Sequence, residues 1–272
     1  MTGYYDELGR SDDPARVDGW RNRLEQWLRF EVLRRGLDIG EGASVVDLGC
    51  GTGRLCGYLG GGDSVQYVGV DLREDAIEWG RRDFPDATFV IGGYGDGQVD
   101  GLGPYDFAVA VGALVGGDGA SGRLRRLETL VDRLDELGQQ GWGLCVLDQD
   151  ELREDVVRSL EPALQGATRG ELDQVARTRG LEVVIDADSW AGELFCMAVR
   201  GEQREVVARR LEGDVAHRRV LQRAEAQGGE IDDVQRGLFW LRAGRVERAK
   251  EIADAISAGT VGASLLRGRL GL

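Results

Sequence analysis

A short segment near residue 50 combines glycine and aspartate at spacings that suit a bound nucleoside. The run 45–48 is apolar except for Asp47, as in a buried strand, and it leads straight into Gly49, Gly51 and Gly53. Glycine lets a backbone turn sharply and lets a ligand approach closely, and the helix start that follows offers unpaired N–H donors. Asp71 stands 18 residues after Gly53, a spacing typical of an acid that accepts hydrogen bonds from a ribose. These residues predict a nucleoside site.

The order of these residues excludes one class of nucleoside site and matches another. A dinucleotide fingerprint requires a third glycine where this chain has Arg54. The D-x-G-x-G-x-G pattern that starts at Asp47 resembles motif I of the class I S-adenosylmethionine-dependent methyltransferases. The resemblance covers about residues 15–200 and implies S-adenosyl-L-methionine as the cofactor.

The resemblance also implies roles for single residues. The loop of Gly49, Cys50, Gly51 and Gly53 would form the floor under the methionine part of the cofactor. Asp47 would lie beneath the loop and help to hold the amino group, while Asp71 would take the ribose hydroxyls. Leu72 would lie against the adenine, and Val111 would line the pocket beside the sulfonium.

Two further implied contacts come from outside the glycine loop. Arg29, with Gln26 on the same helix, would face the cofactor, and Arg29 would bind its carboxylate. On the adenine side, the acid that family members usually carry after the third strand is replaced by Gly93. Either Asp96 reaches back to the adenine, or the backbone and Tyr94 serve instead.

The residue that would take a proton from the acceptor is left open. The only histidine, His217, is expected on a surface helix outside the sheet unit, which argues against a histidine base. The remaining candidates, each more typical of a structural or solvated position, are Tyr4, Tyr5, Asp148 and Asp150. No metal-ligand spacing is present in the sequence, and no metal is expected.

Alternating strand and helix patterns would position these residues. The expected strands are 44–48, 66–70, 87–91, 106–111, 144–147, 181–185 and 194–199, and the expected helices are 17–35, 54–59, 73–82, 124–137, 151–164 and 169–179. Gly36 and Gly180 are expected to end two of these helices. The last two strands are too close for a parallel crossover. The predicted fold is therefore an α/β doubly wound, seven-stranded, mainly parallel sheet with an antiparallel last strand.

A break in composition near residue 200 suggests two units. Residues 1–200 carry a net charge of −16, whereas residues 201–272 carry +2. We expect a methyltransferase domain over 1–200 and a C-terminal α-helical extension over 201–272, with helices at 203–226 and 230–257. The second of these resembles a tetratricopeptide-like hairpin, and residues 203–257 could contact a second copy or a protein partner.

The overall composition limits the partners and the cellular location that we expect. The chain has 272 residues, 42% of them hydrophobic, and its net charge of −14 argues against a nucleic-acid partner. No signal peptide or membrane span is expected, and the cysteines have no pairing pattern, so a cytoplasmic location is predicted. The 34 basic residues include one lysine, Lys250. A GC-rich genome and adaptation to high salt both remain open as explanations of this acidic, lysine-poor protein.

The sequence as a whole favours a methyltransferase with a small-molecule acceptor. No N-P-P-Y motif follows the fourth strand, which disfavours methylation of DNA adenine or glutamine. Two alternatives stay open: a non-catalytic S-adenosylmethionine-binding sensor or scaffold, and a methyltransferase of a protein docked by the helical extension.

Overall fold

A single twisted sheet organises the molecule. The computed structural model describes residues 17–20, 22–95, 97–114, 119–151, 166–190, 192–227, 231–256 and 261–271. The sheet order is β3-β2-β1-β4-β5-β8-β7, with β6 paired to β5 off this path. The strands are β1 (Ser44–Leu48), β2 (Gln66–Asp71), β3 (Thr88–Ile91), β4 (Tyr105–Val111), β5 (Gly138–Asp148), β6 (Gly166–Ala167), β7 (Val184–Asp186) and β8 (Glu193–Val199).

The strand directions agree with those expected from the sequence. Strands β1 to β5 pair in parallel, whereas β8 runs antiparallel to both of its neighbours, β5 and β7. The predicted mainly parallel sheet with an antiparallel last strand is confirmed. Because β8 is reversed, its first residue lies at the edge where β5 ends, and Glu193 pairs with Leu147.

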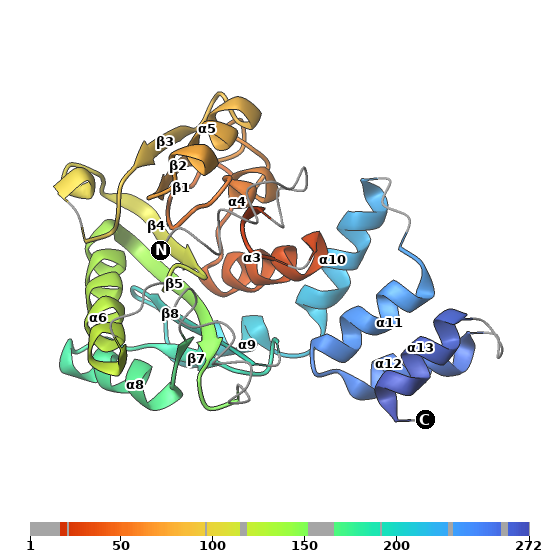
Figure 1. Ribbon diagram of the computed structural model, residues 1–272. Coiled ribbons are helices and arrows are strands. Elements are labelled where there is room, and N and C mark those ends of the chain that lie inside the picture. Colours follow the sequence, from red (N-terminus) through yellow and green to blue (C-terminus); the bar gives the residue numbers. More distant parts are fainter. Residues whose placement is uncertain are drawn as a thin grey trace.

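Helices cover both faces of the sheet and continue beyond it (Figure 1). The helices are α3 (Arg23–Leu37), α4 (Arg54–Tyr58), α5 (Glu74–Asp83), α6 (Gly119–Leu137), α8 (Arg169–Thr178), α9 (Arg204–Leu211), α10 (Val215–Ala226), α11 (Asp233–Arg242), α12 (Val246–Ala255) and α13 (Val261–Leu270), with the 3-10 turn η1 at Gly97–Val99. Among the described residues, no helix combines the length and apolar character that crossing a membrane requires.

Successive side chains along the strands point to opposite faces of the sheet and contribute to two separate hydrophobic cores. Val45 and Phe107 belong to the core shared with α3, α4 and α5, whereas their neighbours Val46 and Ala108 belong to the core under α6 and α8. This alternation follows from the two-residue period of a strand. Three layers result, with the sheet in the middle.

Four expected boundaries were wrong for identifiable reasons. Residues 18–20 form a turn, so the helix expected over 17–35 begins only at Arg23, capped by the Asn22 side chain. The same helix passes Gly36 and ends at Leu37, with Asp38 in the left-handed region. Strand β5 starts six residues before the expected 144, because its glycines and glutamines hide the apolar pattern. The helix expected over 203–226 breaks into α9 and α10 around Gly213, whose φ is +72°.

Helix α6 begins five residues before the expected 124, and β7 begins three residues after the expected 181. The remaining expected elements lie close to their predicted positions. Gly180 follows the cap of α8 with a φ of +67°, as expected for a residue that ends a helix. The helix expected over 151–164 falls largely outside the described residues. Strand β6 had not been expected.

The C-terminal helices attach through α10. Helices α9 and α10 pack on α3, whereas α13 packs on α11 and α12. The ion pair between Arg242 and Glu25, with 2.7 Å between Nη1 and Oε1, ties α11 to the start of α3. The hairpin of α11 and α12 turns at Gly244, whose φ is +74°. In Figure 1 these last helices lie to one side of the sheet unit.

Candidate functional site

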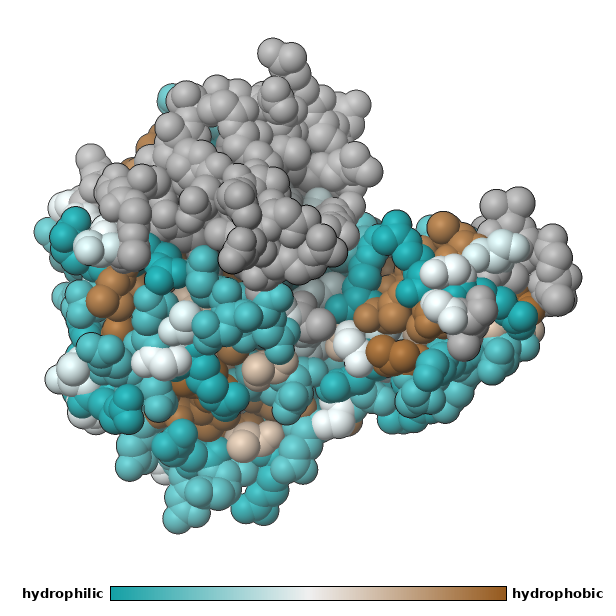
Figure 2. Space-filling model, turned by 60° about the horizontal axis from the view of Figure 1, so that its bottom comes forward, coloured by the Kyte–Doolittle hydropathy of each residue, from teal (hydrophilic) through white to brown (hydrophobic). Residues whose placement is uncertain are grey.

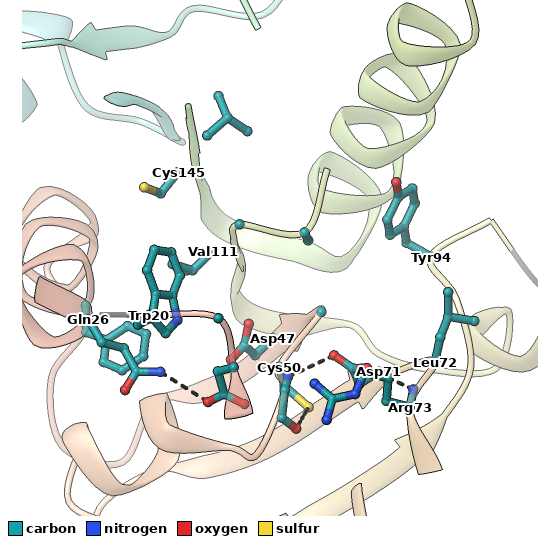
Figure 3. Close-up of a pocket in the computed structure, with 18 of the residues that line it drawn as sticks. Trp20, Gln26, Asp47, Cys50, Asp71, Leu72, Arg73, Tyr94, Val111 and Cys145 are labelled. Carbon is teal, nitrogen blue, oxygen red and sulfur yellow. Dashed lines mark hydrogen bonds between the residues drawn. The ribbon is translucent and has the colours of Figure 1, made fainter. Parts of the chain in front are cut away.

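The expected site residues gather around one cavity at the carboxyl edge of the sheet. The cavity has a volume of about 410 Å³ and is bounded by the ends of β1, β2, β4 and β5 and by the start of β8. In parallel α/β sheets this edge is the usual place for a ligand. Figure 3 shows Leu72 and Tyr94 at one end, Trp20 and Cys145 at the other, and Asp47 and Asp71 between them.

The glycine loop owes its shape to backbone geometry that other residues resist. Gly49, Gly51 and Gly53 have φ values of +81°, +53° and +74°. The N–H groups of Gly49 and Cys50 both donate to the carbonyl of Val70, so the loop is tied to β2. Gly49, Cys50 and Gly51 line the cavity.

Gly53 has a different place from the one expected. It lies outside the cavity lining and caps α4, and a Cβ there would stand 2.6 Å from the Phe89 ring. Glycine is therefore required at residue 53 by its left-handed φ and by the close approach of the Phe89 ring, not by the approach of a ligand.

Asp47 is buried beneath the loop, and only one of its two carboxylate oxygens has a hydrogen-bond donor among the described residues. Its Oδ2 accepts a hydrogen bond from the Tyr67 hydroxyl at 2.7 Å, but its Oδ1 has no partner among the described residues. Burial raises the pKa of Asp47 to about 7, with the nearby Asp71 and Asp18 carboxylates adding to the shift. A buried carboxylate oxygen without a donor is costly, so the site fits a ligand that brings one.

Asp71 and Leu72 lie at the end of β2, as expected. The carboxylate of Asp71 accepts from the backbone N–H of Gly51 and of Arg73, both at 2.9 Å. Each carboxylate oxygen keeps a further lone pair for a ligand hydroxyl. Leu72 also borders the cavity, and 53% of its surface is exposed. Such an exposed apolar side chain at a cavity suits a flat apolar group.

The end of the cavity near Leu72 also contains residues that were expected in the site. Gly92, Gly93 and Tyr94 all line the cavity, as does Val111 at the end of β4. Burial raises the pKa of Tyr94, so its hydroxyl stays protonated near neutral pH. Asp96 lies outside the described residues.

Asp18 is a site residue that sequence reasoning missed. Its carboxylate accepts from the Thr52 backbone N–H and the Thr52 hydroxyl, both at 2.8 Å, and from the Gln26 amide at 3.1 Å. Burial raises the pKa of Asp18 to about 6. Asp18 lies in a turn before α3, and the residue types next to it in the sequence do not indicate a binding site. Gln26 does line the cavity, as expected.

Arg29 does not lie where a cofactor carboxylate could reach it. Its guanidinium is buried and donates to Glu193, with 2.9 Å between Nε and Oε1, and to the carbonyl of Glu25. The rings of Trp20 and Trp190 flank it at 4.4 and 5.1 Å. Arg29 is absent from the cavity lining, where Glu193 stands instead. The expected role is corrected, because a buried arginine pairs with the nearest carboxylate that packing offers.

Of the expected bases, the two that the structure describes, Asp148 and Asp150, do not line the cavity. Asp148 is buried outside the lining and accepts from the backbone N–H of Asp150, which is exposed. Tyr4 and Tyr5 lie outside the described residues. His217 is buried between α10 and α11, not on the surface, and stacks on Trp240 at 5.2 Å between ring centroids. Sequence alone could not place it, because His217 precedes the aromatic residues it meets by more than twenty positions.

Comparison with known proteins supports this description. The profile of a methyltransferase domain matches residues 45–124, which include the glycine loop, Asp71 and Val111. None of the curated proteins compared matches the sequence. Among solved structures, the N-methyltransferase NodS from Bradyrhizobium japonicum WM9, solved with S-adenosyl-L-homocysteine, is 15% identical with a TM-score of 0.52, and the alignment covers 73% of this chain and 97% of that one.

A second solved structure has the same fold. It is the protein in complex with the Trm112 methyltransferase activator of Haloferax volcanii, which is 16% identical with a TM-score of 0.52 over 73% of this chain and 96% of that one. Identities this low show a shared fold, and the domain profile adds the glycine loop and its acids. The resemblance found in the sequence is thus confirmed: residues 45–124 match a methyltransferase domain, and the fold is that of the class I S-adenosylmethionine-dependent methyltransferases.

Proposed function

We propose that the protein methylates a small-molecule acceptor, and that the end of the cavity formed by Asp47, Asp71 and Leu72 holds its cofactor, S-adenosyl-L-methionine. The observation that carries this proposal is the unpartnered Oδ1 of Asp47 at the cavity wall. An ammonium group supplies both the hydrogen-bond donor and the positive charge that this buried oxygen requires.

The charges of the lining support a cationic ligand. Among the described residues that line the cavity, the charged side chains are the guanidinium of Arg73 and the carboxylates of Asp18, Asp47, Asp71, Asp75 and Glu193, the last of which pairs with Arg29. S-adenosylmethionine carries a sulfonium and an ammonium group, so it suits this excess of negative charge. We assign the ribose hydroxyls to Asp71 and the adenine to Leu72, Gly93 and Tyr94.

The chemistry requires mainly alignment. When bound, S-adenosylmethionine supplies a methyl group on a positively charged sulfur, which is already an excellent leaving group. The chain contributes by holding the two reactants in line and by keeping water out. The walls beside Val111 are apolar and suit this role, because Phe30, Ala113 and Val146 also line the cavity.

The size of the cavity favours a small acceptor. Its volume of about 410 Å³ lies at the lower end of the range usual for small-molecule sites. The cofactor takes part of that space. A bulky macromolecular acceptor would therefore have to present a single narrow group.

Calorimetric titration tests the cofactor site. We expect S-adenosylmethionine and S-adenosylhomocysteine to bind at micromolar concentration and NAD not to bind. Asp47→Asn keeps the side-chain volume but removes the charge, so both affinities should fall by about tenfold or more. If Asp47→Asn binds both sulfur ligands as tightly as the wild type does, the proposed role of Asp47 is overturned.

The pH dependence gives a second readout of the same site. The pKa of Asp47 is raised to about 7, so its carboxylate gains a proton as the pH falls from 8 to 6.5. A protonated carboxyl attracts an ammonium group less strongly, so affinity should fall over this range in the wild type. The affinity of Asp47→Asn should vary less, and the difference between the two curves isolates Asp47 from the ionisation of the ligand.

A further inference from the structure

Glu193 is a charged side chain at the end of the cavity away from Leu72 and Tyr94. Glu193, at the start of β8, lies beside Cys145 and Leu147 at the end of β5, with Trp20 and Phe30 on the helix side. Figure 3 shows Trp20 and Cys145 at this end, on the far side of Val111 from Leu72 and Tyr94. Glu193 is 4% exposed, yet it borders the cavity.

The carboxylate of Glu193 is held in one orientation. Its Oε1 accepts from Arg29, whose guanidinium is fixed between Trp20 and Trp190, and its Oε2 accepts from the Cys145 thiol at 3.2 Å. Each carboxylate oxygen can accept more than one hydrogen bond. The ion pair with Arg29 therefore fixes the carboxylate in place while leaving its oxygens able to accept from a ligand.

The strand order sets the distance of Glu193 from the cofactor end. Val111 on β4 pairs with Cys145 on β5, and β8 lies one strand further. Two strand spacings amount to about 10 Å along the sheet edge. That length matches one aromatic ring with a short polar arm.

We propose that Glu193 binds the amino group of the acceptor, and that the acceptor is a small, largely aromatic or aliphatic amine. This inference rests on the proposed function, since it places the acceptor at the opposite end of the same cavity. An anionic acceptor is disfavoured because carboxylates outnumber guanidinium groups in the part of the lining that the structure describes. Arg29 cannot offer its charge to such an acceptor, because Glu193 and two indole rings cover it.

Binding of three matched probes tests the inference without turnover. Benzylamine, benzyl alcohol and benzoate share a ring and differ in charge, and each is titrated by calorimetry into protein saturated with S-adenosylhomocysteine. We expect benzylamine to bind most tightly and benzoate least. Glu193→Gln should weaken benzylamine by about tenfold or more and leave benzyl alcohol within about threefold. Benzylamine binding that is unchanged in Glu193→Gln, or tighter benzoate binding in the wild type, would overturn the inference.

The first titration separates the two proposals. If S-adenosylhomocysteine itself fails to bind, the cofactor assignment falls; if it binds and benzylamine does not, only the acceptor assignment falls. Glu193→Gln leaves a buried arginine without its counter-charge, so an unchanged affinity for S-adenosylhomocysteine serves as its folding control.

A second variant avoids the ion pair. Leu147→Trp fills the acceptor end with a larger side chain and leaves Arg29 and Glu193 in place. It should abolish benzylamine binding while the affinity for S-adenosylhomocysteine stays within about twofold, and retained benzylamine binding would place the amine elsewhere.

Discussion

Gly51 shows how one missing Cβ permits a contact between distant parts of the chain. A Cβ at Gly51 would stand 2.4 Å from Oδ1 of Asp18, the acid that holds Thr52. Glycine at position 51 therefore allows the turn at residues 17–20 to come close to the loop, and it also allows the positive φ of the loop. The turn is fixed at a second point, where Arg73 donates to the carbonyl of Val17 at 2.9 Å.

Gly51→Ala should destabilise the protein and weaken ligand binding. The substitution combines left-handed backbone strain with displacement of the Asp18 carboxylate, so we expect a loss of about 2–3 kcal/mol in the free energy of unfolding. The affinity for S-adenosylhomocysteine should fall by about tenfold or more, because the loop and the turn both border the cavity. Thermal unfolding and calorimetry measure the two effects.

Gly61→Ala is the matched control. Gly61 also has a positive φ, +80°, but a Cβ there would meet nothing within 4 Å. Gly61→Ala should lower the free energy of unfolding only by the backbone strain, about 1 kcal/mol, and should leave the ligand affinity unchanged. Equal losses in the two variants would show that the contact with Asp18 contributes nothing.

At the scale of the element, the junction of α10 and α11 is built on an aromatic cluster. His217 stacks on Trp240 and meets the edge of Phe239, which in turn lies 5.9 Å from Trp190 of the sheet unit. Within the part of the chain that the structure describes, neither ring nitrogen of His217 has a hydrogen-bond partner of normal geometry, although the backbone of Ser189 lies close by. Burial, with the nearby Arg245 guanidinium, lowers the pKa of His217 to about 4.

This pKa predicts an acid-sensitive junction. Because the pKa is lowered in the folded protein from its ordinary value of 6.5, the neutral ring stabilises the fold above pH 6.5, and that contribution is lost as the pH falls toward 4. The loss should amount to about 2–3 kcal/mol. His217→Phe cannot take up a proton, so the stability difference between wild type and variant should change by this amount over that range. A constant difference would contradict the burial of a neutral histidine.

At the scale of the whole molecule, α3 is covered on both sides. One side packs on the sheet, and the other receives α9 and α10, whose Val220, Leu221 and Ala224 belong to the same core as Trp27 and Leu33. Helices α11–α13 form a lobe beside this body, and Figure 2 shows hydrophobic patches on the lobe, which includes the partly exposed Val246 and Leu265. Residues 203–257 remain the predicted contact for a second copy or a protein partner.

Truncation tests whether residue 200 is a true domain boundary. A chain that ends at residue 200 loses α10 and uncovers apolar side chains of α3, each worth about 1.5–3 kcal/mol when buried. Since total stabilities are commonly about 5–15 kcal/mol, we expect this fragment to unfold at a much lower temperature or to aggregate. A chain that ends at residue 256 removes α13 and should keep the cofactor site folded. If the 1–200 fragment unfolds at the full-length temperature, the proposed domain of 1–200 is independent.

The sequence by itself determined the sheet and the residues at one end of the cavity. The glycine loop, Asp47, Asp71 and Leu72 could be predicted because backbone conformation and strand ends depend on local residue types. The reversed last strand could also be predicted, since a short connection cannot cross over in parallel.

Only the tertiary structure decided which charged and polar groups meet. Arg29 and Glu193 are 164 residues apart, and Asp18 and Thr52 are 34 apart, so no local spacing relates them. A charge in the sequence shows that a partner is required if the side chain is buried, but packing selects the partner. The same holds for His217. Its own helix predicts a surface position, but α11 packs against it and buries the ring, because burial depends on the packed elements and not on one helix.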